Sequence, residues 1–116
     1  MKRDFPPVLR VLLSVTVSGP SMVPTLRHGD VLIAVRAGRV RPGDVVLARF
    51  RTLPERLVVK RVVRRVAGAH GDGWWLASDN PFVGGDSETN GVADVVARVR
   101  WRVRPGRPQQ IRRRTS

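Results

Sequence analysis

The sequence predicts an all-β protein, built as a compact, mostly antiparallel sheet that is coiled or barrel-like. Three observations favour this class. Valine-rich segments recur along the chain, glycine, proline and aspartate separate them, and no stretch has the periodicity of a long amphipathic helix. Short apolar segments at this spacing are typical of antiparallel sheets that close on themselves.

Six segments are expected to be strands. In chain order they are residues 9–17, 31–36, 45–50, 57–66, 74–77 and 92–104. The first is an apolar run, the next three are valine-rich, the fifth has adjacent tryptophans, and the last alternates arginine with apolar residues. Proline, which presets φ, and glycine, which accepts positive φ, mark the turns between them. These turns are His28-Gly29-Asp30, Arg41-Pro42-Gly43-Asp44 and His70-Gly71-Asp72-Gly73.

The length of 116 residues predicts one domain with a modest core. We assign residues 1–104 to this domain and expect the polar, basic segment 105–116 to be a disordered tail. The absence of cysteine excludes disulfides and thiolate metal sites. His28 and His70 are far apart and are expected in loops, so we do not expect a histidine-based metal site.

The formal net charge is +13, and two interpretations are open. Alternation of arginine with apolar residues over 97–104 is typical of the solvated face of a half-buried sheet. Alternatively, the charge attracts an acidic partner or an anionic membrane surface. Nucleic acid is disfavoured as a partner because aromatic residues are few, and only Trp74 and Trp75 form an obvious stacking platform.

The N-terminal region has a charged start and an apolar run from Val8 to Val17 that contains Arg10. This run is shorter than the roughly 20 apolar residues of a membrane span. It leads directly into the serine segment without a small-residue cleavage site, so it fits a cleavable signal poorly. We therefore expect a cytoplasmic protein whose contact with membranes is at most peripheral.

Lysine is rare in this chain, because only Lys2 and Lys60 accompany 20 arginines among the 22 basic residues. A guanidinium stays protonated, whereas a desolvated lysine ammonium can lose its proton. Period-2 alternation places Lys60 on one face with Val58 and Val62, where burial favours the neutral amine that a general base needs. The alternative is an edge-strand lysine whose ammonium reaches water.

The segment Val17 to Leu26 is expected to form a tight turn that presents the Ser21 hydroxyl. Prolines on both sides stiffen it, and Gly19 removes bulk where a substrate main chain approaches. The backbone amide of Ser21 can donate to an oxyanion, and Ser18 offers a second hydroxyl. The alternative is an ordinary turn with a solvent-facing serine. Serine activated by a neutral lysine is a known nucleophile-and-base pair.

Four segments resemble the conserved boxes of the type I signal peptidases and their relatives, the S26 family. Together they span about residues 17 to 92. They are the nucleophile box Ser21-Met22-Val23-Pro24-Thr25-Leu26 with Gly29-Asp30, the strand motif Arg41-Pro42-Gly43-Asp44-Val45-Val46, the lysine box Val59-Lys60-Arg61-Val62-Val63, and a last box in Ser78-Asp79-Asn80-Pro81 and Asp86-Ser87 through Gly91.

The resemblance implies a serine–lysine endopeptidase without metal or cofactor, with Ser21 as nucleophile, Lys60 as general base and the family's antiparallel β fold. It implies that an extended substrate pairs with the strands near both residues. The implied substrate-binding and oxyanion residues are Ser18, Gly19, Pro20, Leu57, Val58 and Val59, and the implied structural supports are Asp79 and Asp86.

Three positions depart from the family pattern. Gly19 stands where many members carry a serine that assists the oxyanion hole. Gly84 occupies the position of a serine that commonly orients the lysine, and Glu88 replaces an arginine that pairs with the aspartate of the last box. The last box is therefore expected to be shifted in register or weakened.

The short, arginine-rich chain resembles the subgroup of nickel-type superoxide dismutase maturation proteases, which implies a nickel superoxide dismutase precursor as substrate and partner. Three alternatives stay open. They are a membrane-associated signal peptidase that cleaves secretory signal peptides, the related self-cleaving repressor domain, and a non-catalytic basic β-domain that binds nucleic acid. The repressor is disfavoured because no DNA-binding segment precedes the serine segment in this sequence.

Overall fold

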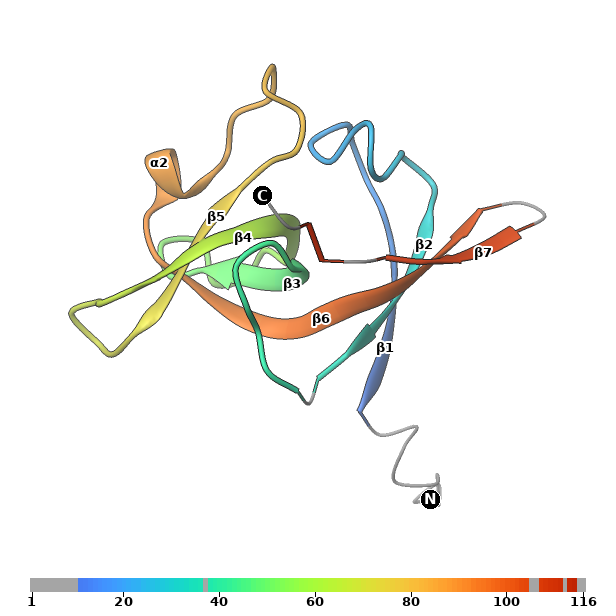
Figure 1. The fold of residues 1–116 in the computed structure, drawn as a ribbon. Coiled ribbons are helices and arrows are strands. Elements are labelled where there is room, and N and C mark those ends of the chain that lie inside the picture. Colours follow the sequence, from blue (N-terminus) through green and yellow to red (C-terminus); the bar gives the residue numbers. More distant parts are fainter. Residues whose placement is uncertain (1–10, 37, 105–106, 112, 115–116) are drawn as a thin grey trace.

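The computed structural model describes residues 11–36, 38–104, 107–111 and 113–114. Its regular structure is almost entirely β (Figure 1). The elements are β1 (Leu12–Thr16), β2 (Val31–Val35), β3 (Val45–Phe50), β4 (Val58–Val66), β5 (Gly73–Ala77), the one-turn helix α2 (Ser87–Asn90), β6 (Ala93–Arg104) and β7 (Arg107–Gln110). The predicted all-β class is confirmed.

One antiparallel sheet contains all the strands, in the order β1-β2-β6-β3-β4-β5 with β7 added on β6. The long strand β6 crosses the molecule and pairs in turn with β5, β3, β2 and β7 (Figure 1). Because β5 pairs with both β4 and β6, the strands β6, β3, β4 and β5 form a closed circuit. The sheet is therefore coiled, as the sequence predicts.

The core consists of two clusters that share strand β3. Val45 and Leu47 pack into one cluster, together with Met22, Leu26 and neighbours from β2 and β6. Val46, Ala48 and Phe50 pack into the other, with residues of β4, β5 and β6. Alternate side chains of a strand point to opposite faces, so β3 is covered on both sides. The first cluster anchors the serine segment, and the second lies under the lysine strand.

The predicted disordered tail is wrong for the described part of residues 105–116. Arg107–Gln110 form β7, which pairs with the end of β6. The N–H of Ile111 then donates to the Arg100 carbonyl, at 2.7 Å. Proline disfavours a central strand but is tolerated at an edge, where β7 lies. Pairing of backbone groups with β6 thus outweighs the polar composition of this segment.

The prediction of a solvated arginine face over 97–104 is also corrected. Trp101 and Val103 are exposed, at 38% and 39%, whereas Arg102 and Arg104 are half-buried. Their guanidiniums donate to the Thr25 carbonyl, and Arg104 also pairs with Asp30 at 3.0 Å. Acceptors on the serine segment therefore draw these arginines inward.

The start of the first predicted strand and the charged N-terminal segment, residues 1–10, lie outside the described residues. Among the residues that are described, no helix is long and apolar enough to cross a membrane.

Candidate active site

A cleft of about 440 Å³ lies between the serine segment, the start of β4 and the chain before α2. Ser21 and Lys60 both line it. The six residues predicted to contact substrate also line this cleft, namely Ser18, Gly19, Pro20, Leu57, Val58 and Val59. Residues more than thirty positions apart in the sequence are thus brought to one surface.

The serine turn is held by its own hydrogen bonds and by buried neighbours. The Val23 N–H donates to the Pro20 carbonyl at 3.1 Å. Met22 and Leu26 are 1% and 0% exposed, so their side chains anchor the turn in the core. Ser21 stays half-buried at the cleft.

Gly19 and His28 form a contact that the sequence does not reveal. Gly19 has a φ of 86°, a value that L side chains rarely adopt. Its N–H donates to Nδ1 of His28 at 3.0 Å. His28 lies in a loop, as predicted, but it also fixes the turn that leads to Ser21. The Gly19 amide is therefore occupied, whereas the Ser21 amide donates to no described residue.

Lys60 is buried at the cleft wall, with its side chain 7% exposed. Its Nζ donates to Ser78 Oγ at 2.7 Å and lies 3.5 Å from Asp86 Oδ1. The Ser78 hydroxyl in turn donates to Asp86 Oδ1 at 2.5 Å. Among the described residues, Nζ makes no hydrogen bond to Ser21. The amine is thus held by a hydroxyl and a carboxylate beside the nucleophile turn.

The pairing of β4 with β5 explains why Ser78 reaches Lys60. At this end of the ladder Arg61 lies opposite Ala77. In an antiparallel pair the next residues outward, Lys60 and Ser78, then approach each other. The register of one hairpin therefore supplies the hydroxyl beside the amine.

Residues 78–80 connect the lysine to the serine turn, and we call them the SDN segment. While Ser78 binds Lys60, the Asn80 N–H donates to the Ser21 carbonyl at 2.9 Å. The Asn80 side-chain amide donates to the Pro20 carbonyl at 3.0 Å. Three consecutive residues thus contact both halves of the candidate site.

Asp79, the middle residue of the SDN segment, is the most buried carboxylate of the site, at 2% side-chain exposure. It accepts hydrogen bonds from Thr25 Oγ1 at 2.6 Å and from Arg61 Nη2 at 2.6 Å, and Arg114 lies 3.3 Å away. Burial alone would raise the pKa of Asp79, but the hydrogen bonds from Arg61 and Thr25 and the nearby positive charges hold this pKa below its ordinary value.

The structure therefore revises the expectation for the last box. Gly84 lines the cleft without a hydroxyl, but Ser78 supplies one to Lys60 from a different position. Glu88 is exposed on α2, and the arginine–aspartate pair of the site is Arg61 with Asp79. Ser78 belongs to the quoted motif, so its residue type was visible, but its role depends on the β4–β5 register.

Within the described part of the chain, no three His, Asp or Glu side chains come together as metal ligands usually do. The polar residues that line the cleft instead include Ser18 and Ser21 with their hydroxyls, Lys60 with its amine, and Arg56, and no carboxylate is among the described lining residues. Such a set suits nucleophilic acyl transfer, in which a hydroxyl attacks a carbonyl and an amine moves the proton.

Comparison with known proteins indicates a peptidase. Residues 10–99 match the family described as Peptidase S24-like. The chain is also 43% identical over 81 residues to the mitochondrial ATP-independent inner membrane protease subunit 1a of Arabidopsis thaliana. That alignment covers 65% of this chain but only 45% of the plant protein, so the chain spans less than half of its relative. The family match covers most of the described sheet, and the chain belongs to the Peptidase S24-like family.

Proposed function

We propose that this protein is a serine endopeptidase in which Ser21 is the nucleophile and Lys60 the general base. The observation that supports it most is the SDN segment, which contacts Lys60 through Ser78 and the Ser21 turn through Asn80. Membership of a peptidase family supports the reaction class.

The proposed acylation step transfers one proton and forms one bond. Neutral Lys60 Nζ takes the proton of the Ser21 hydroxyl while Ser21 Oγ bonds to the scissile carbonyl carbon. The tetrahedral intermediate collapses when the C–N bond breaks, and Lys60 returns the proton to the departing amine. Water then attacks the ester carbonyl and gives a proton to Lys60; the bond from the carbonyl carbon to Ser21 Oγ breaks, Lys60 returns the proton to Ser21 Oγ, and the acid product leaves.

The Ser21 amide is the proposed oxyanion donor, since it points to no other described acceptor, whereas the Gly19 amide is engaged by His28. Amides fixed before reaction stabilise the developing charge without reorganising. In the resting state Lys60 donates to Ser78. Catalytic hydrogen bonds often tighten only when substrate is bound, so we assign the Ser21–Lys60 contact to the substrate complex.

The free strand edges at the cleft support binding of an extended peptide. Residues Val58 and Val59 pair with β3 on one edge, but pairing of β4 with β5 begins only at Arg61. The edge of β4 that precedes Arg61 thus has backbone groups available to a substrate strand. Across the cleft, β1 is the first strand of the sheet order and continues into Ser18, Gly19 and Pro20. Substrate pairing at strand edges gives affinity with little demand on sequence.

The substrate that we propose is the N-terminal propeptide of a nickel superoxide dismutase precursor, cleaved in the cytoplasm. Its support is the resemblance of segment 18–26 to the maturation protease subgroup. The alternative is cleavage of secretory signal peptides by a membrane-associated enzyme, and the name of the plant relative, an inner membrane protease subunit, does not decide between the two substrates.

Intact-mass spectrometry tests the proposal. A nickel superoxide dismutase precursor and, separately, a secretory precursor are incubated with the wild-type protein and with Ser21→Ala. We expect loss of a discrete N-terminal piece from the first precursor with wild type alone. Cleavage of only the secretory precursor would assign the alternative substrate, and cleavage by Ser21→Ala would refute the nucleophile.

A further inference from the structure

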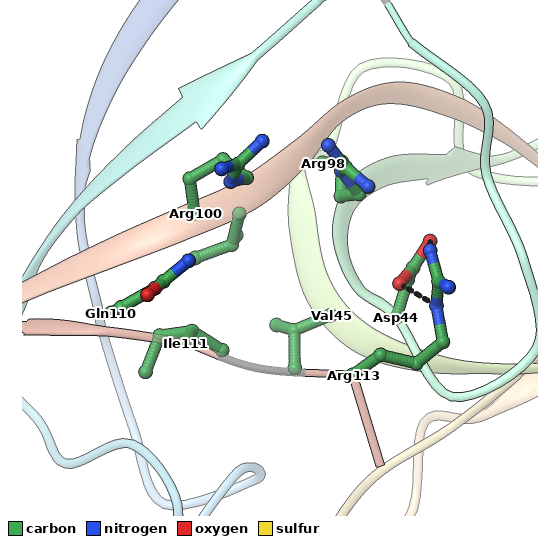
Figure 2. Close-up of a pocket in the computed structure, with 8 residues that line it drawn as sticks. Asp44, Val45, Arg98, Arg100, Gln110, Ile111 and Arg113 are labelled. Carbon is green, nitrogen blue, oxygen red and sulfur yellow. Dashed lines mark hydrogen bonds and ion pairs between the residues drawn. The ribbon is translucent and has the colours of Figure 1, made fainter. Parts of the chain in front are cut away.

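A second cavity, of about 400 Å³, lies away from the cleft and shares no lining residue with it. Figure 2 shows Arg98 and Arg100 of β6 on one side and Arg113 of the C-terminal segment on another. Gln110 and Ile111 complete the wall beside β7. We call this space the arginine cavity.

The positive charge of the arginine cavity exceeds its negative charge. Asp44 is its one lining carboxylate among the described residues. Arg113 Nε already pairs with Asp44 Oδ1 at 2.7 Å, and Asp44 Oδ2 accepts the Arg41 N–H at 2.8 Å. Three guanidiniums thus face a single carboxylate whose hydrogen-bonding capacity is largely used.

Other arginines of the same strand are supplied with acceptors. Arg104 pairs with Asp30, and Arg102 Nη1 donates to the Thr25 carbonyl. In contrast, no described carboxylate lies within salt-bridge distance of Arg98 or Arg100. The Nε atoms of Arg98 and Arg102 are both buried without a hydrogen-bond partner. Arg102 still donates to the Thr25 carbonyl through Nη1, whereas no such bond is found for Arg98 among the described residues. A buried donor without an acceptor is unfavourable, so an acceptor is missing at Arg98.

A β-bulge places Arg100 at this cavity. Ile33 pairs with Trp101 and Ala34 pairs with Val99, which leaves Arg100 without an opposite residue on β2. Bulges redirect side chains and often occur next to binding sites. The Arg100 carbonyl accepts the Ile111 N–H instead, and this bond brings the C-terminal segment with Arg113 to the cavity.

We propose that the arginine cavity binds a phosphate-type oxyanion, either free phosphate or pyrophosphate, or the phosphoryl group of a lipid. Planar guanidiniums bind such groups through two parallel N–H···O bonds. The volume lies in the range of small-ligand sites, about 300–1,000 Å³. The net charge of +13 raises the local concentration of anions. This site is independent of the proposed peptidase activity.

Isothermal titration with pyrophosphate at constant ionic strength tests the site. We expect saturable binding of one anion per chain. The affinity should fall about tenfold or more in Arg98→Gln/Arg100→Gln, since each charge-assisted hydrogen-bonded pair contributes about a factor of ten to the affinity. Arg39→Gln/Arg49→Gln also removes two charges, but from exposed positions, and is expected to change the affinity less than about twofold. Equal losses in the two variants would overturn the site in favour of diffuse attraction.

Two further arms keep the test decisive. Arg98→Lys/Arg100→Lys preserves the charge and is expected to bind pyrophosphate more weakly than wild type, because an ammonium cannot donate two parallel hydrogen bonds as a guanidinium does. If the double glutamine variant fails to fold, the double lysine variant replaces it in the test. Vesicles with phosphatidic acid separate the sources. Vesicle binding that pyrophosphate displaces assigns a lipid phosphoryl group, whereas pyrophosphate binding alone assigns a free anion. Binding of neither would overturn the proposal.

Discussion

The cleft and the arginine cavity both hold cationic side chains, but they neutralise charge differently. At the cleft Lys60 contacts Ser78 and Asp86, and the next residue of β4, Arg61, pairs with Asp79. In the cavity one carboxylate, Asp44, pairs with Arg113, and no described carboxylate pairs with Arg98 or Arg100. Fully paired groups have one preferred geometry, which a catalytic site requires, whereas surplus positive charge leaves capacity for a ligand.

The largest expected effect lies in the cleft. Ser21→Ala and Lys60→Arg should each lower kcat/KM by about a thousandfold or more, because one lacks the nucleophile and the other a group that can accept a proton. Precursor cleavage followed by mass spectrometry measures this, with circular dichroism as the control for folding. Full activity of Lys60→Arg would contradict the assigned base.

Ser78→Ala should have the next largest effect, up to about a hundredfold in kcat, because a misplaced amine loses its alignment with the serine. KM should change little, because Ser78 does not line the cleft. Ser78→Thr retains a hydroxyl and should recover part of the rate. Ser14→Ala, at an exposed position of β1, is the matched control. Loss of stability without a fall in kcat would leave Ser78 a merely structural residue.

Asp79→Asn should lower stability more than activity. It leaves Arg61 buried without its carboxylate, and breaking a buried pair costs about 3–5 kcal/mol. The free energy of unfolding from urea titration measures the change. Asp94→Asn, whose pair with Arg51 involves a carboxylate with 61% side-chain exposure, should cost about 1 kcal/mol or less. Similar decreases in the free energy of unfolding in the two variants would show that burial does not strengthen the Asp79–Arg61 pair.

Stability should fall in acid because of the same residue. The pKa of Asp79 is lowered in the folded protein, so between the folded value and the unfolded value of 3.8 the unfolded state binds more protons. The contribution of Asp79 to the free energy of unfolding is therefore complete above the pKa of the unfolded state, and it is lost as pH falls through the pKa of the folded state. Urea titrations from pH 6 to 2 should show a shallower acid slope for Asp79→Asn than for wild type. Parallel slopes would refute this linkage.

The smallest effect is expected in the arginine cavity without ligand. Arg100→Gln should change the free energy of unfolding by less than about 0.5 kcal/mol, since no described carboxylate pairs with Arg100. Arg104→Gln breaks a pair with Asp30, whose side chain is 5% exposed, and should cost more. Thermal unfolding in phosphate-free buffer measures both, and a reversed order would contradict the difference between the paired and unpaired arginines of β6.

Local sequence patterns sufficed for the strands, and they singled out Ser21 and Lys60 as candidate residues. Valine-rich segments and glycine or proline turns located all six expected strands, and a motif around each residue indicated its chemical type. These features depend on neighbours in the chain. The roles of Ser21 and Lys60 stay predictions until cleavage is measured.

Features that depend on pairing between distant segments could not be predicted. Ser78 reaches Lys60 because of the β4–β5 register, and His28 reaches Gly19 through the folded turn. The strand β7 and the half-buried arginines of β6 depend on partners elsewhere, which the polar composition conceals. Each of these errors followed from judging a segment without its hydrogen-bonding partners.

The most direct test of the central proposal is detection of the acyl-enzyme. A peptide ester that corresponds to the precursor sequence before the cut is mixed with the protein, the reaction is quenched in acid, and peptide mapping locates the added mass. We predict an acyl group on Ser21 in wild type, and none in Lys60→Arg. Acylation of another residue, or cleavage without any covalent intermediate, would contradict the assignment of Ser21 as nucleophile.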